Sequence, residues 1–287
     1  MIGLRMPVAP DVGLMQVPDG VALLVRDLVH EHTGIFFENG RLDLLLDKLR
    51  PLVRSRQQSF MEYYYVLKYE DRRTEWARVA DALSVQETYF WREMPQIRAL
   101  VDVIVPAWFQ RNKGPLRIWS AACATGEEPY TIAIALEEAG WAGHPVEIWA
   151  SDASEGALMR AARGVYRERS FRSLPIGLRG KYFTEVEEGW RIDPMLAARV
   201  KFRRANLVSS SEVRQLASIP VIFCRNVFIY FSPEAIRRTL SHFAEVMPGG
   251  SHLFVGISES LLKMTSDFDL REIGSAFVYE RKAARGT

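Results

Sequence analysis

The spacing of apolar residues changes about a third of the way along the chain. Up to residue 83 it is helical, with apolar side chains every three or four positions in 21–32, 41–56, 59–69 and 73–83. Pro51 cannot donate a backbone hydrogen bond, so we expect it to kink or break the helix over 41–56. This first part contains no stretch with the alternation typical of a strand.

Two details complete this first part. Ser59 and Glu62 stand three residues apart before an apolar run, which is the spacing of a capping box. Residues 1–19 contain three prolines and no regular period, so we expect a loose tail there. The sequence thus predicts an all-helical N-terminal domain over 20–83, followed by a linker over 84–96.

Helical and strand-like patterns alternate in the rest of the chain. The expected helices are 94–111, 129–139, 154–163 and 233–246, and the expected strands are 117–121, 146–151, 219–224, 251–256 and 276–281. Such alternation is typical of parallel strands with crossover helices, so 97–287 is predicted to be a doubly wound α/β domain. Residues 182–204 do not fit it. The pair Glu188-Gly189 predicts a hairpin there, and hence a small β insertion.

Composition is that of an ordinary globular protein. Of the 287 residues 48% are hydrophobic and 25% are charged, and the net charge of +2 gives no general attraction to nucleic acid. We expect no signal peptide and no membrane insertion, because no apolar run approaches the roughly 18 residues of a membrane span. The cysteines, Cys123 and Cys224, and five scattered histidines form no metal-ligand spacing. The expectation is a cytoplasmic protein without a metal site.

The turn inside 117-RIWSAACATGEEPYTIAIAL-136 lies where nucleotide-binding folds usually place a glycine-rich phosphate loop. It holds one glycine, Gly126, followed by Glu127 and Glu128 at the start of a helix. These acids could simply interact with the helix dipole, but they would also repel a pyrophosphate. S-adenosylmethionine suits the turn better, because it has no phosphate and carries a sulfonium and an ammonium group.

Polar residues follow two further predicted strands. Asp152 stands where an acid binds ribose hydroxyl groups in nucleoside-binding sheets, although it or Ser154 could instead only cap the next helix. Arg225 and Asn226 come directly after a strand of continuous apolar residues, and Tyr230 is close to them in the chain. Because ligands of such sheets bind at the carboxyl ends of the strands, these residues are candidates for one site.

A last stretch, 86-QETYFWRE-93, joins the helical and α/β parts, and its Arg92 could pair with Glu93 or reach into the site. Together with WSAACATGEEPY, the strand ending in ASD, ANL at 205–207 and FCRNVFIYF, it resembles the CheR family, the chemotaxis receptor protein-glutamate O-methyltransferases. The family pattern around Arg92 is T-x-F-F-R-E. The resemblance covers roughly residues 20–282.

This resemblance implies a class I, Rossmann-like, S-adenosylmethionine-dependent methyltransferase sheet with an inserted β subdomain, preceded by an all-α domain. It places cofactor contacts on Gln86, Thr88, Arg92, Glu128, Asp152, Asn206, Leu207, Arg225 and Asn226. It also places the catalytic residues Arg92 and Tyr230 near the transferred methyl group. Gln86 departs from the family, which commonly has Asn at this position.

The implied reaction forms glutamate methyl esters on chemoreceptors and releases S-adenosylhomocysteine. A glutamate is already ionised at neutral pH, with a pKa near 4.3, so no general base is needed. The implied partners are glutamate-bearing cytoplasmic receptor helices. We expect docking through the basic helix 41–56, whose charge suits an acidic target, and through the β insertion.

Two other interpretations stay open. A methyltransferase of amides or exocyclic amines would carry an N/D-P-P-Y/F motif after the fourth strand, where this chain has CRNV. A non-catalytic S-adenosylmethionine-binding module that contacts receptors or response regulators would have the same fold. The presence of Glu128, Asp152, Arg225, Asn226 and Tyr230 favours the enzyme.

Overall fold

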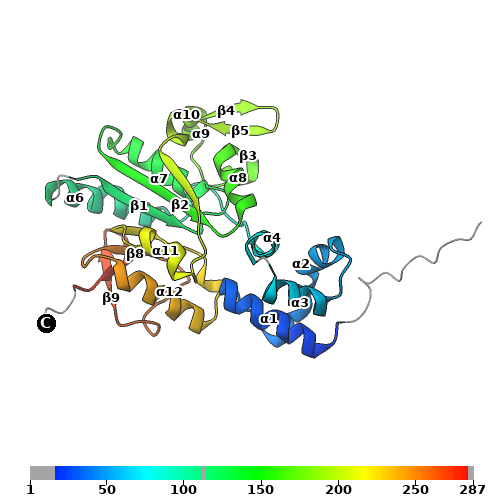
Figure 1. The fold of residues 1–287 in the computed structure, drawn as a ribbon. Coiled ribbons are helices and arrows are strands. Elements are labelled where there is room, and N and C mark those ends of the chain that lie inside the picture. Colours follow the sequence, from blue (N-terminus) through cyan, green and yellow to red (C-terminus); the bar gives the residue numbers. More distant parts are fainter. Residues whose placement is uncertain (1–16, 71, 112–113, 284–287) are drawn as a thin grey trace, which may run out of the picture. The chain divides into compact units, whose positions relative to one another are not determined.

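The computed structural model describes residues 17–70, 72–111 and 114–283 (Figure 1). These residues form two compact units, one of 17–32 and 36–83 and the other of 33–35 and 84–283. Most of the tail expected over 1–19 lies outside the described residues, and Asp19 already belongs to the first helix.

The first unit is helical. Its helices are α1 (Asp19–Thr33), α2 (Leu42–Ser55), α3 (Phe60–Tyr69) and α4 (Arg72–Leu83). The capping box of α3 is confirmed, because the Ser59 hydroxyl accepts from the backbone N–H of Glu62 and the Glu62 carboxylate accepts from that of Ser59. The expected break at Pro51 is wrong. Pro51 is exposed and α2 continues to Ser55, so the carbonyl that loses its partner faces a surface that water can reach.

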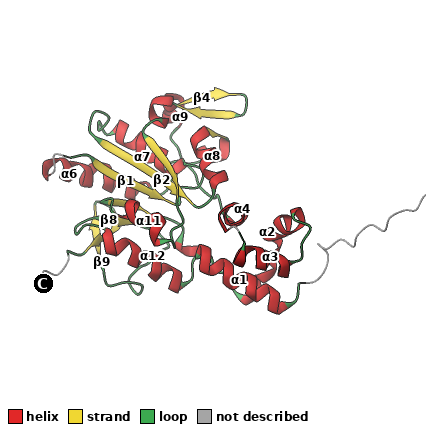
Figure 2. Ribbon diagram, viewed as in Figure 1, coloured by secondary structure: helices red, strands yellow, loops and turns green. Residues whose placement is uncertain are grey.

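A mixed sheet forms the centre of the second unit (Figure 2). It has seven strands in the order β6-β2-β1-β7-β8-β10-β9. Its strands are β1 (Leu116–Ala121), β2 (Val146–Asp152), β6 (Val200–Arg204), β7 (Val221–Phe223), β8 (His252–Phe254), β9 (Phe268–Ile273) and β10 (Ala276–Arg281). The strands from β6 to β8 are parallel, and β10 pairs antiparallel with both of its neighbours, β8 and β9. The predicted α/β architecture is confirmed.

Helices cover both faces of this sheet. They are α5 (Met94–Arg98), α6 (Val105–Arg111), α7 (Glu127–Glu138), α8 (Glu155–Arg163), α11 (Ser210–Ala217) and α12 (Pro233–Val246). Successive side chains of β1 point to opposite faces of the sheet, as in any strand. Ile118 packs in the layer with α5 and α7, whereas Trp119 packs in the layer with α11 and α12, where its ring meets Phe243 edge to face. A single π-helical turn, Ala99–Ile104, joins α5 and α6 within the expected helix 94–111.

The order of the strands creates a switch point. From β1 the chain proceeds outward through β2 to β6, and it then returns to the other side of β1 with β7 and β8. Loops that leave β1 and β7 therefore run in opposite directions and leave a crevice at their carboxyl ends.

The β insertion differs from the prediction. A second sheet, ordered β3-β5-β4, contains β3 (Val165–Tyr166), β4 (Phe183–Val186) and β5 (Gly189–Ile192). Two short helices, α9 (Ile176–Tyr182) and α10 (Pro194–Ala197), flank its hairpin. The predicted hairpin at Glu188-Gly189 is present, but β6, expected inside 182–204, pairs with β2 in the main sheet. Strand β9 was not predicted.

Candidate functional site

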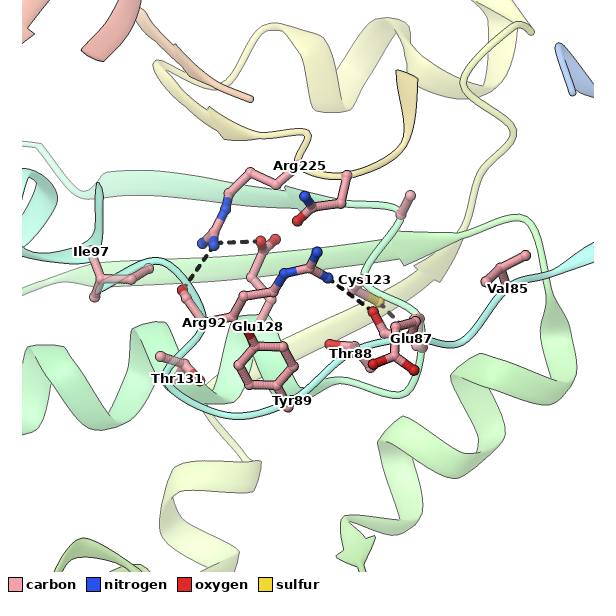
Figure 3. A pocket seen from close by; sticks show the side chains of 13 residues that line it. Val85, Glu87, Thr88, Tyr89, Arg92, Ile97, Cys123, Glu128, Thr131 and Arg225 are labelled. Carbon is pink, nitrogen blue, oxygen red and sulfur yellow. Dashed lines mark hydrogen bonds and ion pairs between the residues drawn. The ribbon is translucent and has the colours of Figure 1, made fainter. Parts of the chain in front are cut away.

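A hollow of about 530 Å³, which we call the β1–β7 hollow, lies at the switch point and is open to solvent (Figure 3). Its lining comes entirely from the second unit. The lining residues are Val85, Glu87, Thr88, Tyr89, Arg92, Ile97, Ala122, Cys123, Ala124, Glu128, Thr131, Arg225 and Asn226.

The loop after β1 uses its backbone N–H groups within the protein. Cys123 donates to the carbonyl of Ser151 at 2.8 Å, Ala124 donates to Oδ2 of Asp152 at 2.9 Å, and Gly126 donates to the carbonyl of Cys123 at 3.0 Å. In phosphate-binding loops such N–H groups point at the ligand. This loop is therefore not arranged to bind a phosphate.

The two acids at the start of α7 face different surroundings. Glu127 is buried, and its carboxylate accepts from the hydroxyls of Thr125 at 2.7 Å and Ser170 at 3.0 Å, so it joins the loop to the β insertion. Glu128 faces the hollow and accepts from the Ser120 hydroxyl at 2.6 Å. Burial raises the pKa of Glu128, while the Arg225 charge and the Ser120 hydrogen bond act in the opposite direction. The β1–β7 hollow thus has a partly desolvated acid at its base.

Arg225 is held between two carboxylates. Its side chain is 2% exposed and lies 3.5 Å from Oε2 of Glu128 and 3.3 Å from Oε2 of Glu93. It also donates to the backbone carbonyl of Arg92 at 2.8 Å. A buried cation needs such partners, and here they fasten 92–93 to the start of α7. Arg92, whose Nε lies 3.8 Å from Oε1 of Glu93, is a second cation beside these two acids.

Left-handed backbone is concentrated at the site. Six described residues other than glycine have φ between 48° and 69°, and all but Gln57 lie in the segments around the hollow; these five are Trp91, Glu93, Ala122, Ala124 and Asn226. This conformation costs a typical L-residue about 1–2 kcal/mol. The surrounding hydrogen bonds must hold it, which is common at functional sites.

Arg92 is less constrained than Arg225. Its guanidinium donates to the backbone carbonyl of Glu87 at 2.9 Å and lies 5.5 Å from the ring centre of Tyr89 (Figure 3). Burial raises the pKa of Tyr230, and the positive charge of Arg92 partly opposes this rise. Tyr230 does not line the hollow, and about a third of its surface is exposed.

The structure brings together five of the nine residues that the sequence predicted for cofactor binding: Thr88, Arg92, Glu128, Arg225 and Asn226. Asp152 lies behind the loop, with its carboxylate accepting from the N–H groups of Ala124 and Ser154. The N-cap of α8 is Ser154, whose hydroxyl accepts from the N–H of Ala157.

The other predicted cofactor residues lie outside the lining. The backbone N–H of Ala205 bonds to the carbonyl of Asp152, so Asn206 follows β6 at the same edge of the sheet. The side chain of Asn206 accepts from the N–H of Val208, and Leu207 is buried. Gln86 is partly exposed and does not line the hollow.

Sequence reasoning missed two acids. Glu93 accepts from the side chain of Asn226 and from the N–H of Ile257, in addition to its ion pair with Arg225. Glu259 accepts from the N–H groups of Asn226 and Ile229. A signal was available, since Glu259 follows β8, the strand beside β7, and so stands at the ligand-binding edge of the sheet.

Comparison with known proteins agrees with this geometry. The family described as "CheR methyltransferase, SAM binding domain" matches residues 86–277. The chain belongs to the CheR methyltransferase family. It is 36% identical over 261 residues to chemotaxis protein methyltransferase 2 of Vibrio cholerae, covering 88% of this chain and 90% of that protein. It is 33% identical over 254 residues to the chemotaxis protein methyltransferase of Klebsiella aerogenes, covering 86% and 85%.

Among solved structures, magnesium protoporphyrin IX methyltransferase of Synechocystis PCC 6803 with bound SAM matches with a TM-score of 0.36 and 14% identity, covering 92% of this chain and 95% of that chain. As a CheR methyltransferase, this chain uses S-adenosylmethionine as its methyl donor. Its fold is the class I methyltransferase fold that the sequence predicted. Within the described residues, no helix has both the length and the apolar character needed to cross a membrane.

Proposed function

We propose that this CheR protein methylates glutamate carboxylates of chemoreceptors, in the cytoplasm, to form methyl esters. The observation that carries this proposal is the chemistry around the β1–β7 hollow. Its loop N–H groups are bonded within the protein, and carboxylates stand where a phosphate would need cations. Such a site suits a phosphate-free, positively charged nucleoside.

The residues present fit S-adenosylmethionine. Glu128 would hold a positively charged end of the cofactor, and Asp152 would bind its ribose hydroxyl groups beside the loop that it fixes at Ala124. Thr88 and Asn226 would contact it from opposite walls, with Gln86, Asn206 and Leu207 nearby. When bound, S-adenosylmethionine supplies an electrophilic methyl group on a sulfonium.

The chain's own residues then have to position an acceptor rather than activate it. A glutamate carboxylate is ionised at neutral pH, so no base needs to remove a proton. The buried Cys123 is unsuited to that task in any case, because burial raises the pKa of its thiol. We assign Arg92 and Tyr230 to orienting the incoming carboxylate toward the methyl group, since orientation can lower the barrier by several kcal/mol.

Docking of the receptor is assigned to the basic helix 41–56 and to the β insertion. Arg56 and Arg50 are partly engaged, since Arg56 pairs with Glu70 and Glu75 and Arg50 pairs with Asp47. Arg41 and Arg54 are exposed and are available to an acidic helix. In the insertion, β4 is an edge strand of its sheet and can accept an added strand.

The decisive experiment supplies methyl-labelled S-adenosylmethionine and purified cytoplasmic fragments of candidate receptors. We expect label on the receptor fragment that mild base releases as methanol, because carboxyl methyl esters are base-labile. A matched fragment with its glutamates replaced by glutamine should take up no label. Label that resists mild base would contradict glutamate as the acceptor.

A further inference from the structure

The segment after β7 carries three candidate site residues on a turn with little regular structure. Arg225 and Asn226 leave the strand, Asn226 has a φ of 58°, and a short 3₁₀ turn, Phe228–Tyr230, follows. Asn tolerates the left-handed region better than most residues, but the local chain alone does not fix this conformation. Another group must hold the turn in place.

One carboxylate does so. Oε2 of Glu259 accepts from the backbone N–H of Asn226 at 2.8 Å and also from that of Gly256. Oε1 accepts from the N–H of Ile229 at 3.3 Å, the residue before Tyr230. Hydrogen bonds to a carboxylate are about twice as strong as neutral ones, so this group binds both ends of the turn.

The loop after β8 is closely packed at Gly256, beside Glu259. A Cβ added at Gly256 would lie 2.5 Å from Nδ2 of Asn226 and 2.9 Å from Oε2 of Glu259. The same Asn226 amide donates to Oε1 of Glu93 at 3.3 Å. The loop after β8 therefore packs directly on the turn after β7, and the two are fixed as one piece.

We propose that Glu259 is a positioning residue for methyl transfer, which acts by placing Asn226 and Tyr230. Glu259 does not itself line the hollow. Among its backbone partners, Asn226 lines the hollow and Ile229 directly precedes Tyr230. The inference rests on the proposed role of Tyr230 at the acceptor. Removal of the charge of Glu259 should loosen the turn and misplace Tyr230 without emptying the hollow of any lining side chain.

A double-mutant cycle tests this. Glu259→Gln should lower kcat about tenfold in the wild-type background, since three hydrogen bonds to a charged acceptor are weakened. In the Tyr230→Phe background the same substitution should lower kcat less than threefold, because the group that Glu259 places no longer contributes fully. Circular dichroism and thermal melting establish that each variant is folded. Glu245→Gln, an exposed acid on α12, is the matched control and should change neither background.

Two results would overturn the proposal: an unchanged kcat in Glu259→Gln, or a loss of equal size in both backgrounds. The second result is what general weakening of the fold would give. If Tyr230→Phe alone leaves kcat unchanged, the proposed role of Tyr230 fails instead, so the two failures are distinguishable. If Glu259→Gln does not fold, the cycle is run with Glu259→Asp, which keeps the charge but shortens the reach.

Discussion

At the scale of single residues, the two arginines of the site have different surroundings. Arg225 is buried between Glu93 and Glu128, so its charge is used to hold the walls of the β1–β7 hollow together. Arg92 donates to one backbone carbonyl, lies 3.8 Å from Oε1 of Glu93 and is more exposed than Arg225. Arg92 is thus the arginine that can meet an incoming carboxylate.

We predict that Arg92→Ala loses most turnover, by at least tenfold in kcat, while the protein stays folded. The substitution removes one hydrogen bond and a partly exposed cation, neither of which holds the core. Labelled methyl transfer and thermal melting check this. Arg98→Ala, at an exposed position of α5, serves as the control and should behave as wild type. A near-normal kcat in Arg92→Ala would exclude a catalytic role.

Glu128 provides a test by pH. Because burial raises its pKa, Glu128 takes up a proton at a higher pH than the same carboxyl in the unfolded chain, near 4.3. Affinity for S-adenosylhomocysteine should therefore fall as pH drops through this raised pKa. Protonation of Glu128 favours the folded state in that range, since the folded protein binds this proton more tightly, so this group's protonation does not unfold the chain.

Calorimetric titration of S-adenosylhomocysteine between pH 7 and pH 5 measures the effect. Glu128→Gln should bind more weakly at pH 7 and should lack this part of the pH dependence. Profiles that run parallel in the wild type and in Glu128→Gln would show that another group titrates.

Sequence reasoning named five of the residues that line the β1–β7 hollow but not the partners that hold them. Asp152, Arg225 and Asn226 were found because they directly follow predicted strands, where side chains converge on a ligand. Glu93 and Glu259 were missed because they act by accepting hydrogen bonds from backbone N–H groups of distant segments, such as those of Ile257 and Asn226. Such contacts depend on tertiary structure, and no local pattern records them.

At the scale of elements, the turn into α7 depends on Gly126. Its φ is 94°, and an added Cβ would lie 2.9 Å from Cβ of Ala161 and 3.0 Å from the hydroxyl of Tyr166. Gly126→Ala should therefore lower the free energy of unfolding by about 2–4 kcal/mol, from backbone strain and overpacking together. Urea unfolding measures this loss.

Gly140→Ala is the matched control for that prediction. Gly140 also has a positive φ, of 80°, but no atom outside its immediate neighbours lies within 4 Å of its added Cβ. It should lose only about 1 kcal/mol, from the backbone conformation alone. Equal losses in the two variants would mean that the close packing at Gly126 contributes nothing.

Elements with a strong period were predicted well, and short or edge elements were not. The expected helix 233–246 matches α12 at both ends, because Ser232 and Pro233 mark its start. The residues of β6 were included in the insertion expected over 182–204, although β6 pairs with β2. Which sheet an edge strand joins is decided by tertiary pairing rather than by its own residues.

At the scale of the whole molecule, the chain contains two compact units, and the lining of the β1–β7 hollow belongs to only one of them. We therefore expect substitutions in 41–56 to leave the lining of the hollow unchanged. This separation follows from the fold and could not be read from the periodicity of the helical part, which indicates helices but not their task.

We predict that reversing the charge of Arg50 and Arg54 to Glu raises KM for the receptor at least tenfold and leaves the affinity for S-adenosylhomocysteine unchanged. The reason is lost attraction between the helical unit and an acidic receptor helix. Steady-state kinetics and calorimetry give the two values. Arg237→Glu, an exposed position on α12 in the other unit, is the control. Equal loss of receptor use and cofactor binding would count against docking through 41–56.

The bridge formed by Glu127 limits how modules of this family can be exchanged. Its carboxylate joins Thr125 of the loop after β1 to Ser170, and the Tyr166 hydroxyl donates to the carbonyl of Thr125 at 2.8 Å. A chimera that received a foreign insertion without equivalents of Tyr166 and Ser170 would leave Oε1 of the buried Glu127 carboxylate and the carbonyl of Thr125 without these donors. Grafts between relatives should succeed only when the transplanted segment contains hydroxyl groups equivalent to those of Tyr166 and Ser170.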